Sequence, residues 1–293
     1  MHLYRSLAKR LFPFLIKNIE RYQRYVAASA PQKRGEMETI LQRFVWSQIQ
    51  TVEKDSTKLL FHCTNQLTAW RANSFFEKEP ETLAWLDSVP TGSSLWDIGA
   101  NVGLYTIYAG KVRNCRVYAF EPSVCNLELL ARNVHLNDLS SNVTIVPTAL
   151  SDVAKEGAFE LSSLEQGGAC STFAEGYDSF GEPMESIFSY RTLSLSGDDL
   201  VALYKLPIPD YIKMDVDGIE HLILAGMGGI LRSPQLKGLL VETSFDFQEQ
   251  AEKITELLES AGFTLVERAH AECFEGTRFG NTFNCIWTRT TLT

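Results

Sequence analysis

The chain has 293 residues, 45% of them hydrophobic and 22% charged, a composition typical of a globular protein with a sizeable core. Its formal net charge of −9 is unevenly distributed: residues 1–43 carry nine lysines and arginines against three glutamates, whereas the remainder carries 18 basic and 33 acidic side chains. An acidic body argues against a nucleic acid held through its phosphates, so we expect no nucleic-acid partner.

The cysteines and the apolar runs indicate the compartment. Six cysteines are scattered without a C-x-x-C pair or a metal-binding spacing, which is typical of reduced, buried thiols. No apolar run reaches the ~18 residues that a membrane-spanning helix requires, and the basic N-terminus has no convincing cleavage pattern of a secretory signal. We therefore expect a cytoplasmic protein without an integral membrane segment.

The N-terminal segment, residues 1–29, places leucines and aromatic residues near helical spacing with basic residues between them. A basic amphipathic helix packs on its own chain, packs on a second copy as a homo-oligomer, or lies on an anionic membrane surface. Packing is the commoner outcome, and we adopt it.

The segment that follows predicts a linker over 30–35 and a helix over 36–47. Residues 52–63 are typical of strands, and residues 80–87 of a helix. We place a helical N-terminal extension at residues 1–90 and the main domain at residues 91–293.

The main domain opens with a strand, a glycine turn and a helix. Residues 95–98 form an apolar run, Gly99 and Gly103 bracket a turn, and apolar residues resume at helical spacing from Leu104. This order is the start of a nucleotide-binding α/β unit, in which glycines let backbone N–H groups approach a ligand at a helix N-terminus.

The spacing within this turn indicates the ligand. It reads D-x-G-x-x-x-G, with Asp97 at the strand end and Asn101 in the turn, whereas dinucleotide-binding proteins use G-x-G-x-x-G. A carboxylate aimed into the turn repels a pyrophosphate and favours a cation. S-adenosylmethionine carries a sulfonium, an ammonium and no phosphate, so it is the preferred ligand. An ordinary turn and an NAD-dependent enzyme are the rival interpretations.

A second acid follows one strand later. Residues 116–120 predict a strand that ends at Glu121 and Pro122. Glu121 lies 24 residues after Asp97, the distance expected of an acid that accepts hydrogen bonds from a ribose. The two motifs in register are a stronger indication than either alone.

Four segments in this order, DIGANVG, AFEP, ALSD and IKMDVDGIE, resemble the FkbM family of S-adenosylmethionine-dependent methyltransferases over about residues 78–262. The resemblance implies a Rossmann-like class I methyltransferase sheet of the α/β class. It also implies transfer of a methyl group to a hydroxyl of a small molecule, a sugar or a secondary metabolite. The cofactor-binding residues are placed on these motifs: Asp97, Gly99, Ala100, Asn101, Gly103, Glu121, Pro122, Ala149 and Leu150.

The rest of the domain alternates strands and helices around one long insert. Strands are predicted over 142–147, 210–215 and 237–242, helices over 124–136, 219–231 and 248–261, and a final antiparallel pair over 263–268 and 281–288. Residues 155–200 break this pattern, and a loop of this length is usually functional or mobile. In an open α/β sheet the ligand lies beyond the strand C-termini, so we expect Asp97, Glu121, Asp215 and Glu242 to line one crevice.

The expected catalytic residues are Asp215, Glu220, His221 and Glu242. Asp215 ends the fourth strand, where the transferred methyl group would lie, and Asp217 follows it. Two mechanisms are consistent with this cluster: a carboxylate or the histidine removes the hydroxyl proton, or several carboxylates hold Mg²⁺, which lowers the hydroxyl pKa. We assign no metal ligand, because Asp217 stands where the family usually has the longer glutamate.

Other functions remain as alternatives. Within the enzyme class, the methyl group could be transferred to nitrogen or to a carboxylate. Outside it, the chain could be a non-catalytic S-adenosylmethionine-binding sensor or partner subunit. The dense carboxylates around residues 215–220 favour an enzyme, since a binding protein would not need them.

Overall fold

The computed structural model describes residues 17–18, 20–22, 24–25, 27–28 and 31–290, which divide into two compact units, Met1–Gln48 and Ile49–Thr293. In the first unit, helix α2 (Pro31–Trp46) runs through residues 31–35, where we predicted a linker. Most of the helix predicted over 1–29 lies outside the described residues, and those described within it are helical. The homo-oligomer expected through this segment stays a prediction.

The second unit begins well before the predicted boundary at residue 90, because the segment 49–90 belongs to it. That segment forms the hairpin of β1 (Ile49–Lys54) and β2 (Thr57–His62), followed by helices α3 (Gln66–Asn73), α4 (Phe75–Lys78) and α5 (Pro80–Ser88). The predicted strand-rich stretch and the last helix are thereby confirmed.

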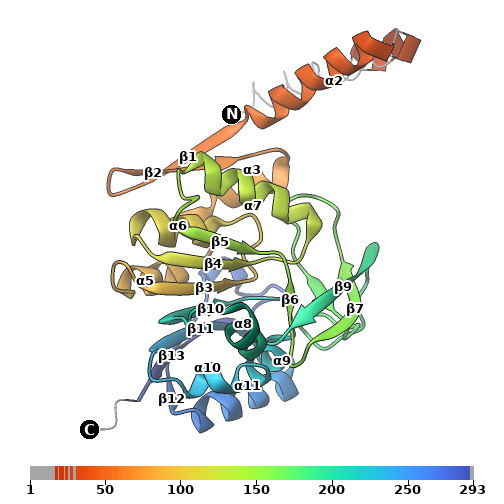
Figure 1. The fold of residues 1–293 in the computed structure, drawn as a ribbon. Helices are drawn as coiled ribbons and strands as arrows, with labels where there is room; N and C mark the ends of the chain where they lie inside the picture. The colour runs from red at the N-terminus through yellow and green to blue at the C-terminus, as the bar shows by residue number, and fades with distance from the viewer. Residues whose placement is uncertain (1–16, 19, 23, 26, 29–30, 291–293) are drawn as a thin grey trace. The chain divides into compact units, whose positions relative to one another are not determined.

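A seven-stranded sheet forms the centre of the second unit, in the order β12-β13-β11-β10-β3-β4-β5 (Figure 1). Its strands are β3 (Ser94–Ile98), β4 (Arg116–Phe120), β5 (Val143–Val146), β10 (Tyr211–Met214), β11 (Gly238–Ser244), β12 (Phe263–Ala269) and β13 (Thr282–Arg289). β13 runs in the direction opposite to the other six strands of this sheet, so its pairs with β11 and β12 are antiparallel and the remaining pairs are parallel. The predicted α/β sheet with a final antiparallel pair is confirmed.

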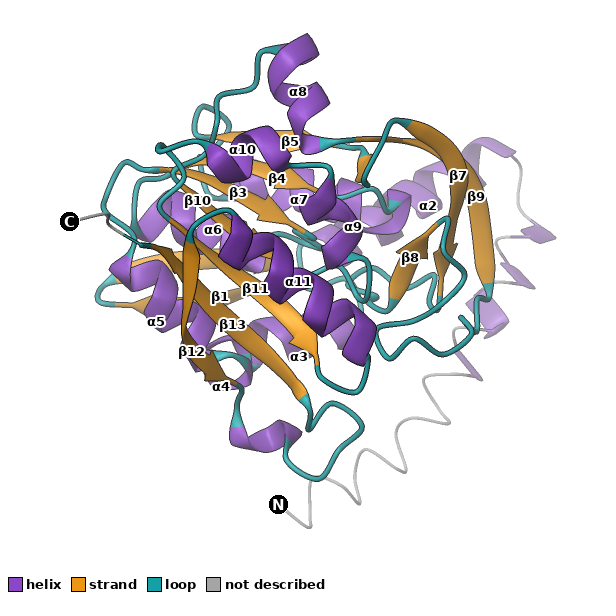
Figure 2. Cartoon of the chain, turned by 90° about the horizontal axis from the view of Figure 1, so that it is seen from below, coloured by secondary structure: helices purple, strands orange, loops and turns teal. Residues whose placement is uncertain are grey.

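Helices cover both faces of this sheet because side chains alternate along its strands. Leu95 belongs to one buried cluster, with α5, α6 (Leu104–Val112) and α7 (Val124–Leu136). Trp96, its neighbour in β3, belongs to the other. That second face carries α8 (Gly197–Tyr204), α9 (Glu220–Ala225), α10 (Gly228–Arg232) and α11 (Gln248–Ser260) (Figure 2).

The strand order reverses at β3, which pairs with β4 on one side and β10 on the other. The connections after β3 and β10 leave their strands at the same edge and diverge there. Such a switch point opens a crevice beyond the strand C-termini, which is where ligands bind in sheets of this kind.

The segment 148–200, which contains the predicted insert 155–200, is more ordered than its sequence indicates. It builds a second sheet in the order β6-β9-β7-β8, from β6 (Ala149–Leu150), β7 (Lys155–Leu161), β8 (Ser171–Phe173) and β9 (Phe188–Leu195). A 3-10 helix, Glu272–Phe274, lies between β12 and β13. Among the residues that the structure describes, no helix has both the length and the apolar character needed to cross a membrane.

Candidate active site

Two cavities meet at the C-terminal edge of the sheet. Cavity A lies over β4 and the second sheet, and its wall includes Glu121, Leu150 and Phe159. Cavity B lies between the helices before β3 and the strand ends, and its wall includes Arg71, Tyr105 and Glu242. Both are lined by the same five residues, which we call the shared rim: Gly99, Asn101, Ala169, Asp215 and Asp217.

The glycine turn fits tightly against the turn after β10. Gly99 has a φ of +81°, and a Cβ on it would lie 1.8 Å from the carbonyl oxygen of Asp215. Gly103 has a φ of +89° and begins α6, and a Cβ there would meet Leu130 at 2.6 Å. The first glycine therefore brings the two turns together, whereas the second packs α6 against α7 and lines neither cavity.

Asp97 differs from the prediction, because it is 1% exposed and lines neither cavity. Its carboxylate accepts a hydrogen bond from Thr106 and lies 4.0 Å from the ammonium of Lys213. Burial raises the pKa of Asp97, while the charge of Lys213 opposes that rise. The acid that we expected to face a bound cation instead faces a lysine of its own chain.

Glu121 takes the predicted position in cavity A. It is 5% exposed, and each carboxylate oxygen accepts one backbone N–H at 2.7 Å, from Asn101 and from Ser123. Burial raises its pKa to about 7 despite these bonds. Carboxylate oxygens hold further lone pairs, so Glu121 can still accept from a ligand. Pro122, Ala149 and Leu150 also line cavity A, and Ala100 lines cavity B.

Asn101 and Asp217, two members of the shared rim, hold the loop 166–171 over both cavities. Asn101 has a φ of +52° and donates from Nδ2 to the Gly168 carbonyl at 2.7 Å. Asp217 has a φ of +62° and accepts from the Cys170 N–H at 2.8 Å. The insert therefore covers the crevice, a role for these two residues that we did not foresee.

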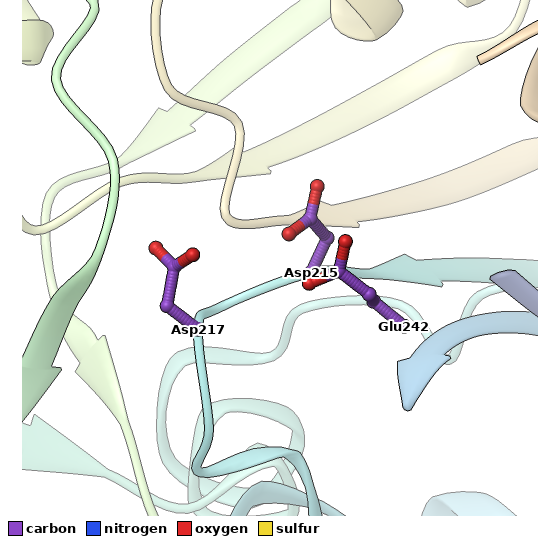
Figure 3. Close-up of side chains that lie close together, drawn as sticks. All are labelled: Asp215, Asp217 and Glu242. Atoms are coloured by element: carbon purple, nitrogen blue, oxygen red, sulfur yellow. The ribbon is translucent and has the colours of Figure 1, made fainter. Parts of the chain in front are cut away.

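Three carboxylates gather at the strand ends. Asp215 follows β10 and Glu242 lies in β11, next to each other in the parallel register, and Asp217 lies further along the turn (Figure 3). One oxygen of each lies within 4.8 Å of the others. This is the clustering expected of Asp215 and Glu242 from the sequence.

Lys213 determines how these acids are charged. It is 1% exposed, and its ammonium donates to Asp215 at 3.0 Å and lies 5.0 Å from the centre of the Tyr105 ring. Burial acts to raise the pKa of Asp215, but the charges of Lys213 and Lys78 outweigh it, and the pKa lies below its ordinary value. Lys213 and Asp215 are two residues apart at the end of β10, and this spacing places both side chains on the same face of the sheet.

The other two acids respond in the opposite direction. Burial, and then the charge of Asp215, raise the pKa of Asp217 to about 6. The same two causes raise the pKa of Glu242 well above its ordinary value. Lys213 and Lys78 therefore favour the ionised form of Asp215, while burial and the charge of Asp215 favour the protonated forms of Asp217 and Glu242.

Glu220 and His221 lie outside the walls of both cavities. Glu220 is 2% exposed and accepts from the Val216 N–H at 3.0 Å and from the Gln250 amide at 2.6 Å. It shapes the turn after β10 from behind. The ring of His221 meets the ring of Phe247 edge-on at 6.2 Å, and burial lowers its pKa. Neither side chain is placed for the catalytic role that we predicted.

The wall of cavity B opposite the acids comes from the segment before β3 together with Tyr105 of α6. Tyr105 donates from its hydroxyl to Glu79 at 2.7 Å, and Glu79 also pairs with Lys78. Arg71 and the half-exposed Trp70 lie on α3 at the same cavity. Trp70 and Arg71 carry no motif of their own, and only the folded chain brings them to the site.

A larger hollow, about 1050 Å³, opens elsewhere on the second unit, where β10 and β11 begin. Its wall includes Trp85, Tyr211 and Ile286. None of the predicted site residues lines this hollow, and those that line a cavity lie in cavities A and B.

Comparisons with known proteins agree with this geometry. A model of the methyltransferase FkbM domain matches residues 97–265. The chain is similar to hexuronic acid methyltransferase AglP of Haloferax volcanii, with 25% identity over 201 residues, 68% of this chain and 77% of that relative. It is also similar to methyltransferase sdnD of Sordaria araneosa, with 35% identity over 68 residues, 23% of this chain and 26% of that relative.

Among solved structures, methyltransferase FkbM from Methylobacillus flagellatus KT is similar in fold. Its TM-score is 0.50 at 14% identity, and the match covers 76% of this chain and 52% of that one. This likeness concerns the fold alone and confirms the predicted Rossmann-like class I methyltransferase sheet.

Proposed function

Because this chain belongs to the FkbM methyltransferase family, we propose that it transfers a methyl group from S-adenosylmethionine to a hydroxyl of a sugar or a related small molecule. The observation that carries the proposal is the shared rim, where cavities A and B meet at Asp215. Methyl transfer needs a donor and an acceptor in line across a short distance, and two cavities joined at one carboxylate provide that arrangement.

The residues of cavity A and the shared rim fit the donor chemically. Glu121 offers carboxylate oxygens for the ribose hydroxyls, and Leu150 and Phe159 offer an apolar wall for the adenine. Asp215 and Asp217 place negative charge where the sulfonium and ammonium would lie. When bound, S-adenosylmethionine supplies an electrophilic methyl group.

We assign different roles to the two strand-end acids. Asp215, held ionised by Lys213 at 3.0 Å, stabilises positive charge at the rim without giving up a proton. Glu242 lines cavity B, and its raised pKa suits a general base that removes the hydroxyl proton of the acceptor. The alternative that the cluster holds Mg²⁺ is weaker, because Lys213 already neutralises part of its charge.

The wall of cavity B supports a sugar-like acceptor. Trp70 is 48% exposed at its edge, and an exposed indole offers an apolar face to a sugar ring. Thr282 is 7% exposed, and its hydroxyl has no hydrogen-bond partner among the described residues. Thr282 belongs to the wall of cavity B, and an unpaired hydroxyl in such a wall is suited to bond a ligand hydroxyl. A relative that acts on a hexuronic acid makes acidic sugars the first class to try.

The test is an assay with labelled S-adenosylmethionine against sugars, uronic acids and hydroxylated metabolites, with and without EDTA. We expect a methyl ether on a hydroxyl, unchanged by EDTA. Calorimetry should also show that S-adenosylhomocysteine binds and NAD does not. A methyl ester or an N-methyl product would show that the acceptor group is a carboxylate or a nitrogen and not a hydroxyl. Activity that EDTA abolishes and Mg²⁺ restores would show that the carboxylates bind a metal ion. Tight binding of NAD would contradict the proposal that S-adenosylmethionine is the donor.

A further inference from the structure

Arg71 of α3 lies in the wall of cavity B beside the shared rim. Its Nε donates to the Gly167 carbonyl at 2.7 Å, and the next carbonyl, that of Gly168, accepts from Asn101 at 2.7 Å. The arginine and the glycine turn therefore bind consecutive residues of one loop. The positive charge of Arg71 also acts to lower the pKa values of Asp215 and Asp217. The guanidinium therefore lies within electrostatic reach of both rim acids.

The guanidinium retains binding capacity after this contact. An arginine has five N–H donors, and the bond to Gly167 uses the one on Nε. Among the residues that the structure describes, no carboxylate lies within salt-bridge distance of Arg71. The other two cations at cavity B are already paired, Lys78 with Glu79 and Lys213 with Asp215. Arg71 is thus the cation of this wall that is best able to receive an anion from a ligand.

The chemistry of the proposed donor requires such a group. S-adenosylmethionine ends in an amino acid, whose ammonium and carboxylate lie on one carbon. The rim acids suit the ammonium, but they repel the carboxylate, which needs a cation at short range. A planar guanidinium binds a carboxylate through two parallel N–H bonds.

From this arrangement, and resting on the proposed function, we infer that Arg71 binds the carboxylate of the donor's amino acid. Arg71 would then bind the amino-acid end of S-adenosylmethionine, opposite to the adenine end in cavity A. The acids and the arginine together then form a zwitterion site, and the loop 166–171 closes over it.

The experiment compares two ligands that differ only in this carboxylate, S-adenosylhomocysteine and its decarboxylated form, by calorimetry. The wild-type protein should bind S-adenosylhomocysteine about 10- to 100-fold more tightly, the range for a charge-assisted bond. In Arg71→Met, which keeps the apolar stem, this preference should disappear. Arg71→Lys should keep part of it, and Arg191→Met, an exposed arginine paired with Glu156, should keep all of it.

Each outcome decides the inference. Equal affinity of the wild-type protein for both ligands overturns it without any variant. A loss on Arg71→Met that is the same for both ligands also overturns it, because the arginine would then act only by anchoring Gly167. Unchanged binding with a raised KM for the acceptor would assign Arg71 to the acceptor instead. If the wild-type protein binds neither ligand, the proposed donor itself is wrong.

Discussion

Asp97 within β3 and Asp215 just after β10 both approach Lys213, but the fold uses these two aspartates in opposite ways. In the parallel register Lys213 pairs with Asp97, and Met214 pairs with Ile98. Asp97 therefore lies inside the sheet opposite the lysine, while Asp215 emerges one residue beyond the last pair. An offset of two residues decides which acid is buried against Lys213 and which also reaches the cavities.

A similar contrast holds for two of the buried glutamates, both of which follow a strand of the central sheet. Glu121 after β4 and Glu220 after β10 both have a pKa raised by burial to about 7 and both accept backbone N–H groups. Glu121 keeps one side toward cavity A, whereas the Gln250 amide of α11 covers an oxygen of Glu220. A strand-end acid becomes a ligand-binding group only if no later helix covers it.

The close approach of the two turns gives the largest expected effect. Gly99→Ala would place a methyl group 1.8 Å from the Asp215 carbonyl oxygen at a φ of +81°, so the turns must separate. We expect a loss of more than about 4 kcal/mol in the free energy of unfolding, or no folded protein. Gly92→Ala is the matched control, since Gly92 has a φ of +83° and no atom within 4 Å, and should cost roughly 1–2 kcal/mol. If urea denaturation shows the same loss of unfolding free energy for both variants, backbone strain at positive φ, and not the contact with Asp215, accounts for the effect of Gly99→Ala.

Glu242 carries the next effect, because we propose that it removes the proton. Glu242→Gln should lower kcat about 10²- to 10⁴-fold. A base acts when it is ionised, so in the wild-type protein activity should rise with pH through a pKa raised by burial and by the charges of Asp215 and Asp217. The variant should lose that rise, while Glu259→Gln, on the exposed face of α11, should keep it. If Glu242→Gln keeps the pH profile of the wild-type protein, Glu242 is not the general base.

Crossed variants of the two aspartates test the comparison itself. Asp215→Asn should lower kcat about 10²- to 10³-fold, and it should also lower the free energy of unfolding by roughly 2–4 kcal/mol, because Asp215 is the nearer partner of the buried Lys213 ammonium. Asp97→Asn should leave kcat within a few-fold and lower the free energy of unfolding by roughly 2–4 kcal/mol, because it weakens the buried partner of Lys213. Steady-state kinetics and urea denaturation on both variants measure this. The comparison is wrong if the two variants lose activity equally.

The pH dependence of stability is the smallest expected effect. Burial raises the pKa values of Glu121 and Glu220 to about 7, so the folded state binds more protons than the unfolded state between about pH 5 and 8. The contribution of these two glutamates to the free energy of unfolding is complete below their pKa in the unfolded chain. It decreases by roughly 2–4 kcal/mol as the pH rises through their pKa in the folded protein. The lowered pKa of His221 opposes part of this loss. Urea denaturation of the ligand-free protein at pH 5 and pH 8 checks the sign, and a higher midpoint at pH 8 would contradict it.

Much of the fold could be predicted because its signals are local. The alternation of apolar runs with helical spacing indicated the strands and helices of the sheet in chain order, and the glycine turn indicated where the crevice opens. The insert was harder to predict: β7 pairs with both β8 and β9, and only pairing between distant residues reveals that small sheet. The same holds for residues 49–90, which the sequence separated from the domain to which they belong.

The sequence by itself determined the order of the elements, the position of the glycine turn and the acid that follows the second strand, because each depends on neighbours a few residues away. Only the tertiary structure decided which acids line the two cavities. Strand register places Lys213 opposite Asp97, the amide of Gln250 covers Glu220, and α3 brings Arg71 to the rim. Exposure and charge of a side chain depend on what folds against it, and those partners lie up to a hundred residues or more away along the chain.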